Sequence, residues 1–173
     1  MRFWFDTEFI EDGKTIDLIS IGLVSEDGRE FYAINSDCDY DKASQWVRDN
    51  VLVQLKAHTE TYLTRSEIRD AVLEFVGEYP IATGATKPEF WAYYADYDWV
   101  VLCQLFGTMM DLPKGWPMYC RDVKQLCDML GNPALPTQGK GEHHALADAC
   151  WTKSAWNFLF AEWERQHDES PRL

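Results

Sequence analysis

Two carboxylates stand one residue apart near the start of the chain: Asp6 and Glu8, in the stretch RFWFDTEFI. The aromatic and branched residues around them predict a strand, and side chains alternate across a strand, so both carboxylates lie on one face. Unpaired carboxylates repel each other, and burying them is costly. An edge strand with both acids in water is one explanation. The apolar strand favours a central position, where the pair would bind a divalent cation such as Mg²⁺ or Mn²⁺.

A cation site needs further oxygen ligands, and two later stretches offer them. Asp96 and Asp98, in YYADYDWVVL, stand where a predicted strand gives way to a helix, although an acid there could instead cap that helix. Asp148 follows His143 and His144 in GEHHALADA. If the last helix begins at or after His143, this histidine lies in the preceding loop and can swing over Asp148. The residues alone leave both the aspartates and the histidines as alternatives.

Three predicted strands position the first two acids. They have the sequences RFWFDTEFI, TIDLISIGLVS and EFYAINS, and the turns EDGK and EDGR join them. Asp-Gly between alternating apolar runs is typical of tight hairpins, so the first three strands should form an antiparallel meander.

Helices and one more strand follow the meander. The apolar spacing predicts helices in DKASQWVRDNVLVQL, DWVVLCQLFG and RDVKQLCDMLG, and a long last helix in HHALADACWTKSAWNFLFAEWE. A capping box, Thr64 to Glu67, begins the helix of TRSEIRDAVLEFVGEY, Gly107 should end another helix, and EFWAYY reads as a strand. We therefore expect one α/β domain over residues 1–173, with a mixed central sheet flanked by helices.

Composition narrows the class of protein. The net charge of −13 argues against a protein that reads DNA sequence with a basic face. It is compatible with an enzyme that holds a nucleic-acid end through bound cations, because these change the local sign of the field. Five cysteines without a Cys-x-x-Cys pair disfavour structural zinc and a disulfide framework. Reduced thiols, an acidic N-terminus unlike a signal peptide and the lack of a membrane-length apolar run predict a cytoplasmic protein.

Three motifs in order now point to a family. Asp-x-Glu in a first strand, aromatic-Asp at a helix start and His-x-x-x-x-Asp near the C-terminus resemble the DEDDh 3′–5′ exonuclease superfamily, which has the ribonuclease-H-like fold. The stretches FDTEFIEDG, LISIGLVSEDGREFYA, WVRDNVL and YDWVVLCQLFG resemble more narrowly the mycobacterial polyadenylate-specific 3′-exoribonuclease AS group. The aromatic-Asp pair favours Asp98, and the pattern His-x-Ala-x-x-Asp-Ala favours His143. Tyr94 departs from the superfamily, since many members have Asn there.

The resemblance implies a mechanism and a substrate. Two divalent metal ions, Mg²⁺ or Mn²⁺, would be held by Asp6, Glu8, Asp98 and Asp148, and His143 would be the general base. The expected activity is removal of nucleoside 5′-monophosphates from the 3′ end of single-stranded RNA. A 3′–5′ exonuclease acting on DNA is one alternative, and a non-catalytic module that binds a nucleic-acid end is another.

The resemblance also suggests contacts with substrate and with a second copy. Residues just after Asp-x-Glu touch the terminal nucleotide in similar enzymes, and here these are Phe9 and Ile10, although Phe9 could equally pack in the core. Trp46 is a weaker candidate for lining the site, because core packing is the stronger expectation for it, and Lys140 could meet a phosphate. Many members form homodimers, for which the last helix offers an aromatic face: Trp156, Phe160 and Trp163.

Overall fold

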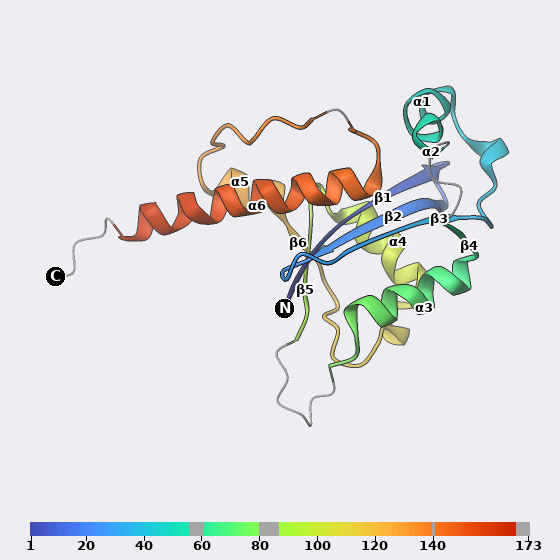
Figure 1. The fold of residues 1–173 in the computed structure, drawn as a ribbon, viewed down its shortest axis with the longest axis horizontal. Helices are drawn as coiled ribbons and strands as arrows, with labels where there is room; N and C mark the ends of the chain where they lie inside the picture. The colour runs from blue at the N-terminus through green and yellow to red at the C-terminus, as the bar shows by residue number, and fades with distance from the viewer. Residues whose placement is uncertain (56–60, 80–86, 140, 169–173) are drawn as a thin grey trace.

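The computed structural model describes residues 1–55, 61–79, 87–139 and 141–168 (Figure 1). Its centre is a mixed sheet with the strand order β4-β3-β2-β1-β5-β6. The strands are β1 (Arg2–Glu11), β2 (Ile16–Ser25), β3 (Glu30–Asn35), β4 (Tyr62–Leu63), β5 (Glu89–Ala92) and β6 (Arg121–Asp122). The first three strands form the predicted antiparallel meander, whereas β4, β5 and β6 pair in parallel. β1 therefore lies inside the sheet, as its composition predicted.

Four of the predicted helices form, with ends that differ from the predicted ones by up to four residues. The helices of the structure are α1 (Gln45–Val47), α2 (Val53–Leu55), α3 (Arg65–Val76), α4 (Asp96–Phe106), α5 (Val123–Met129) and α6 (Ala145–Asp168). Thr64 and Glu67 close the capping box of α3, and Gly107 ends α4 with a φ of 121°. Among the described residues, none of these helices has the length and apolar character needed to span a membrane.

The prediction of one continuous helix in DKASQWVRDNVLVQL is wrong. A π-helical segment, Arg48–Leu52, separates α1 from α2, and a 3₁₀ turn, Tyr40–Lys42, precedes them. The stretch combines branched and short polar residues, which are poor helix formers. The guanidinium of Arg48 also donates to the carbonyls of Ala43 and Asp41, which fixes the start of the segment. π-Helical turns often occur at functional sites.

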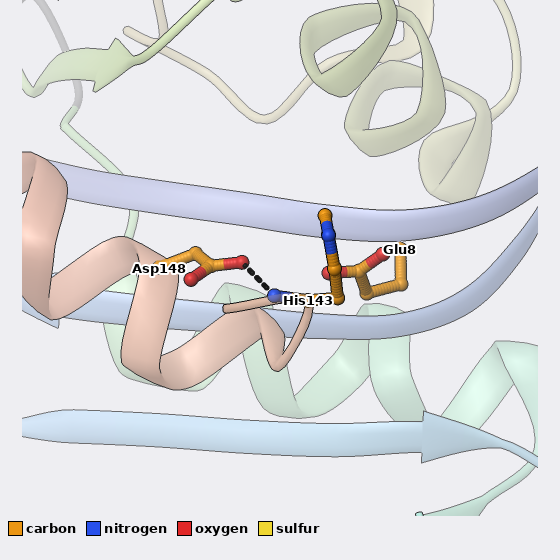
Figure 2. A group of neighbouring side chains, drawn as sticks. All are labelled: Glu8, His143 and Asp148. Carbon is orange, nitrogen blue, oxygen red and sulfur yellow. Dashed lines mark hydrogen bonds between the residues drawn. The ribbon is translucent and has the colours of Figure 1, made fainter. Parts of the chain in front are cut away.

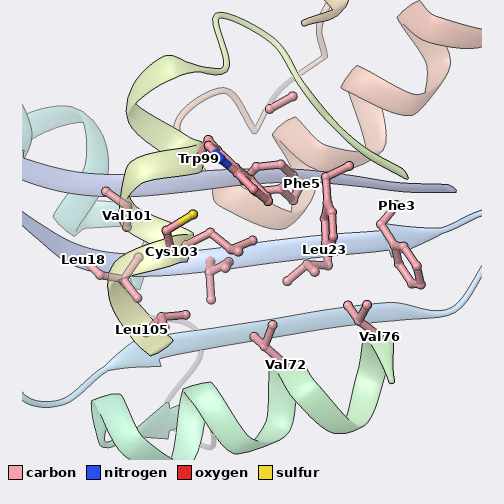
Figure 3. Packing of buried hydrophobic residues seen from close by; sticks show 14 of the residues in the cluster. Phe3, Phe5, Leu18, Leu23, Val72, Val76, Trp99, Val101, Cys103 and Leu105 are labelled. Carbon is pink, nitrogen blue, oxygen red and sulfur yellow. The ribbon is translucent and has the colours of Figure 1, made fainter. Parts of the chain in front are cut away.

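Alternation along β1 builds a core on each face of the sheet. Phe3 and Phe5 point to the face covered by α3 and α4, where Trp99 packs against Phe5 (Figure 3). The ring of Phe90 packs against both phenylalanines. Trp4 points to the other face, which α6 crosses (Figure 1), and packs edge-on against Trp156 at 5.3 Å between ring centroids. The same alternation carries Asp6 and Glu8 to the α6 side.

A register shift and a glycine in β2 shape the region beside these acids. The register with β1 shifts between Glu8 and Phe9, so that Ile19 is an extra residue in β2. Such bulges re-aim neighbouring side chains and are common beside active sites. Gly22, opposite Asp6, lets α6 approach: a Cβ at this position would lie 2.4 Å from the backbone of Leu146.

We predict that Gly22→Ala destabilises the protein by about 1–3 kcal/mol, because the added methyl group overlaps main chain that cannot rotate away. Urea unfolding measures the loss. Gly139→Ala is the matched control, since a Cβ at Gly139 has no heavy atom within 4 Å in the described structure. Equal stability of the two variants would contradict the close approach of α6 to β2.

Candidate active site

An acidic cluster forms where β1 meets the start of α6. Ligand atoms of Glu8, His143 and Asp148 all lie within 4.8 Å of one another (Figure 2). Asp6, on the same face of β1, lines a cavity of about 270 Å³ together with His143 and Asp148. The structure thus brings together residues that are more than 130 positions apart in the sequence.

The start of α6 fixes the histidine beside the acid. The helix begins at Ala145, so His143 lies in the preceding loop, as the sequence analysis required. The backbone of His143 is left-handed, with a φ of 68°, which is uncommon for a residue other than glycine. Its backbone N–H donates to Oδ2 of Asp148 at 2.9 Å, and the side-chain amide of Gln138 donates to Oδ1. Main chain and loop therefore orient both oxygens of Asp148.

The two adjacent histidines have different surroundings. The ring of His144 stacks on Tyr32 at 4.4 Å between centroids, and the N–H of Ala147 donates to its Nδ1 at 3.4 Å. His143 belongs to the acidic cluster, and Trp46 packs edge-on against its ring at 4.8 Å. This arrangement supports His143 as the functional histidine of the pair.

Burial distinguishes Asp98 from Asp96. Asp96 is exposed, whereas Asp98 is only 6% exposed, and the N-cap of α4 is Ala95 rather than either acid. Oδ1 of Asp98 accepts hydrogen bonds from the backbone N–H and the hydroxyl of Thr7, at 2.8 and 2.6 Å. Asp98 is therefore anchored from the α4 side to the residue between Asp6 and Glu8.

The four carboxylates influence one another's protonation. Burial raises the pKa of Asp6 well above its ordinary range, and the charges of Asp98, Glu8 and Asp148 raise it further. Burial, then the charges of Asp148 and Asp98, raises the pKa of Glu8 to about 8. Burial raises the pKa of Asp98 to about 6, although the hydrogen bonds from Thr7 lower it. The pKa of Asp148 is also raised by burial, against the hydrogen bonds that it accepts.

The donor set fits hard divalent cations. In the part of the chain that the structure describes, no ion pair joins these four carboxylates to a lysine or arginine. Buried acids without a cationic partner are costly, and bound cations would offset that cost. Carboxylate oxygens suit Mg²⁺ and Mn²⁺. The acidic cluster can therefore hold metal.

The residues predicted to contact substrate differ in exposure. Phe9 is half-buried and stacks on Tyr97 at 5.6 Å with 9° between the ring planes. Ile10 is 5% exposed and packs with Val51, so its side chain belongs to the core. The expectation that Trp46 packs in the core is wrong, because its side chain is 55% exposed. Lys140 lies outside the described residues.

Sequence reasoning did not identify three residues that shape the site. Thr7 anchors Asp98, Gln138 orients Asp148, and Tyr97 stacks on Phe9. The position of Thr7 on the face opposite its two acidic neighbours was a usable signal, because a polar residue buried in an apolar strand needs a partner. No sequence signal pointed to Gln138, because its contact with Asp148 depends on the path of the loop.

We predict that Asp6→Asn stabilises the metal-free protein, and by more at pH 8 than at pH 5. The pKa of Asp6 is higher in the folded than in the unfolded protein, so ionisation costs folding stability as pH rises above about 4, the value in unfolded chains. Asparagine removes the charge from the group. Thermal unfolding in EDTA at both pH values measures the difference from wild type, and a difference that shrinks with pH would contradict the prediction.

Comparison with known proteins places this chain in a family. The family model for the 3′–5′ exoribonuclease Rv2179c-like domain matches residues 1–160. The 3′–5′ exoribonuclease Rv2179c of Mycobacterium tuberculosis (strain ATCC 25618 / H37Rv) is 43% identical over 150 residues, which cover 86% of this chain and 87% of the relative. The 3′–5′ exoribonuclease MT2234.1 of M. tuberculosis (strain CDC 1551 / Oshkosh) matches to the same extent.

A solved structure shows the same fold. The structure described as 3′-end specific recognition of a histone mRNA stem-loop by a 3′-exonuclease aligns with a TM-score of 0.54 at 11% identity, covering 91% of this chain and 63% of that one. This likeness confirms the predicted ribonuclease-H-like fold, and the family match confirms the predicted class of enzyme. The chain belongs to the 3′–5′ exoribonuclease Rv2179c-like domain family.

Proposed function

We propose that this chain removes nucleoside 5′-monophosphates from the 3′ end of single-stranded RNA, with two divalent ions, Mg²⁺ or Mn²⁺, at the acidic cluster. Asp6, Glu8, Asp98 and Asp148 would hold the ions. The observation that carries the proposal is the convergence of Glu8, His143 and Asp148 within 4.8 Å beside Asp6. The names of the family and of its relatives supply the reaction class and favour RNA over DNA.

Bound divalent ions would lower the pKa of the attacking water and stabilise the departing 3′ oxygen. The chain's own contribution is to hold four carboxylates in place before substrate arrives. Thr7 and Gln138 donate to Asp98 and Asp148, which restricts the rotation of these side chains. Ligands fixed by such partners bind metal more tightly than free ones do.

His143 is the proposed general base. A ring nitrogen takes one proton of the attacking water, whose oxygen forms the new bond to phosphorus. The bond from phosphorus to the 3′ oxygen breaks, and that oxygen takes a proton from solvent. The left-handed backbone of His143 and the hydrogen bond from its N–H to Asp148 keep the ring above the acids. Trp46 limits its motion on one side.

Aromatic residues provide the proposed contact with the terminal nucleotide. The stacked pair of Phe9 and Tyr97 offers a flat apolar surface, and stacking on such surfaces tolerates any base. Trp46 is exposed beside His143 and could form a second wall. For Ile10, whose side chain is buried, a contact would involve the main chain.

We further propose a cytoplasmic homodimer whose contact includes the aromatic face of α6. Phe160 stacks between Trp156 and Trp163, at 4.8 and 5.7 Å, and Trp163 is 41% exposed. Exposed stacked aromatics of this kind are enriched at protein interfaces. All five cysteines are free, as expected for a reducing compartment.

Incubation of the protein with 5′-labelled single-stranded RNA and Mn²⁺ or Mg²⁺ tests the proposed function. We expect a ladder that shortens by one nucleotide from the 3′ end, with nucleoside 5′-monophosphate as product. Asp6→Asn should give no ladder, because it loses a metal ligand. A matched DNA oligonucleotide decides between the two nucleic acids. Intact RNA with both metals would favour a non-catalytic binding module.

We predict that His143→Gln lowers kcat by roughly 10²–10⁴-fold, the range for loss of a general base. His144→Gln is the matched control and should change kcat by far less, because His144 packs on Tyr32 instead of joining the acids. Single-turnover assays at saturating RNA measure both variants. Equal losses would show that His143 has no special role in proton transfer.

A further inference from the structure

The catalytic cavity continues beyond the acids. Tyr94 lines both this cavity and a neighbouring one of about 700 Å³. The larger cavity shares Tyr119 and Asp122 with a third cavity of about 270 Å³. Trp91 and Arg121 also line this third cavity. The second and third cavities lie beside β6, the last strand of the sheet, and Tyr94 stands between them and the cavity at the acids. We call these two cavities together the β6 groove.

The walls of the β6 groove expose aromatic surface. Tyr94 is 63% exposed and Tyr119 is 57% exposed, values that are high for large apolar rings. Tyr94 is held in a left-handed conformation with a φ of 57°, and its backbone N–H donates to Oδ1 of Asp122 at 3.2 Å. The N–H of Ala95 donates to the other oxygen of Asp122 at 3.4 Å. The loop that presents Tyr94 is therefore anchored.

Arg121 supplies a positive charge at the far end of the β6 groove. Its guanidinium lies 5.6 Å from the ring centroid of Trp91 and 5.7 Å from that of Tyr119. One carboxylate, that of Glu89, pairs with it at 3.6 Å, and its side chain is 41% exposed. In a chain with a net charge of −13, an arginine between two aromatic rings at this end of the groove has the chemistry to bind one phosphate and its adjoining bases.

We propose that the β6 groove binds the upstream nucleotides of the RNA, with Tyr119 stacking on a base and Arg121 binding a phosphate. This inference rests on the proposed function, since it extends the substrate from the catalytic acids. Arg121 pairs with Trp91, and Trp91 with Trp4, so Arg121 lies two strands across and two residues along from Asp6. That offset is roughly 12 Å between main chains, which is within reach of a short single strand that starts at the acids.

The test compares kcat/KM on a dinucleotide and on a decanucleotide. Wild type should prefer the longer RNA. Arg121→Gln and Tyr119→Ala should lower kcat/KM on the decanucleotide by about tenfold or more, because KM rises. Neither variant should change kcat/KM on the dinucleotide. Tyr119→Phe should retain the preference. Arg121→Gln should also reduce the salt slope of binding by about 0.7, the value for one phosphate of a single strand.

Arg69→Gln is the control, because Arg69 is an exposed arginine paired with Asp70 on α3. Equal losses on both substrate lengths, no loss on the decanucleotide, or a change of molecular mass in sedimentation would overturn the proposal. Binding of labelled decanucleotide in EDTA provides a readout independent of cleavage. If wild type cleaves nothing, the proposed function fails, and weaker binding by Arg121→Gln still decides whether the groove holds RNA.

Discussion

Electrostatic repulsion among four carboxylates, two of them buried and two half-buried, is the constraint around which this protein is organised. Asp6 and Glu8 come from one strand, Asp98 from the first turn of α4 and Asp148 from the first turn of α6. Left alone, each would move toward water or take up a proton. They stay together because each is tied to rigid structure: two to the central strand, one to Thr7 and one to the backbone of His143. The sheet, both helix starts and the tight crossing at Gly22 all serve this convergence.

The same constraint explains why the sheet is assembled as it is. The meander places β1 inside the sheet, so that both of its faces are covered and alternate residues reach opposite layers. Aromatic residues fill both layers near the start of β1, and the acids follow further along the strand. α4 and α6 approach β1 from opposite sides, so that Asp98 bonds to Thr7 on one side while Asp148 lies beside Glu8 on the other. The fold thus brings Asp6 and Glu8 of β1 next to His143 and Asp148 at the start of α6, far away in the sequence.

Much of this arrangement could be predicted from residue types and spacing. Asp-Gly turns, the capping box at Thr64 and the alternation in β1 are local signals, and local physics determines their outcome. Asp6 and Glu8 were singled out because acids in an apolar strand are conspicuous, whereas the choice of Asp98 over Asp96 and of His143 over His144 came from the resemblance to a family. The π-helical break at Arg48 and the partners Thr7 and Gln138 were not found. The π-helical break depends on the bonds of Arg48 to Ala43 and Asp41, Thr7 bonds to a residue 91 positions away, and Gln138 depends on the path of a loop, none of which periodicity encodes.

The link between His143 and Asp148 is made by a main-chain N–H, a group that every amino acid except proline carries. This hydrogen bond therefore does not depend on the side chain, although the left-handed backbone of His143, with a φ of 68°, disfavours β-branched residues. Exchanging the ring for a smaller residue keeps the loop anchored while leaving space where the ring had been. Position 143 is consequently a natural place for an engineer to replace the proton acceptor, with a diffusible base or a non-natural residue, while retaining the surrounding architecture.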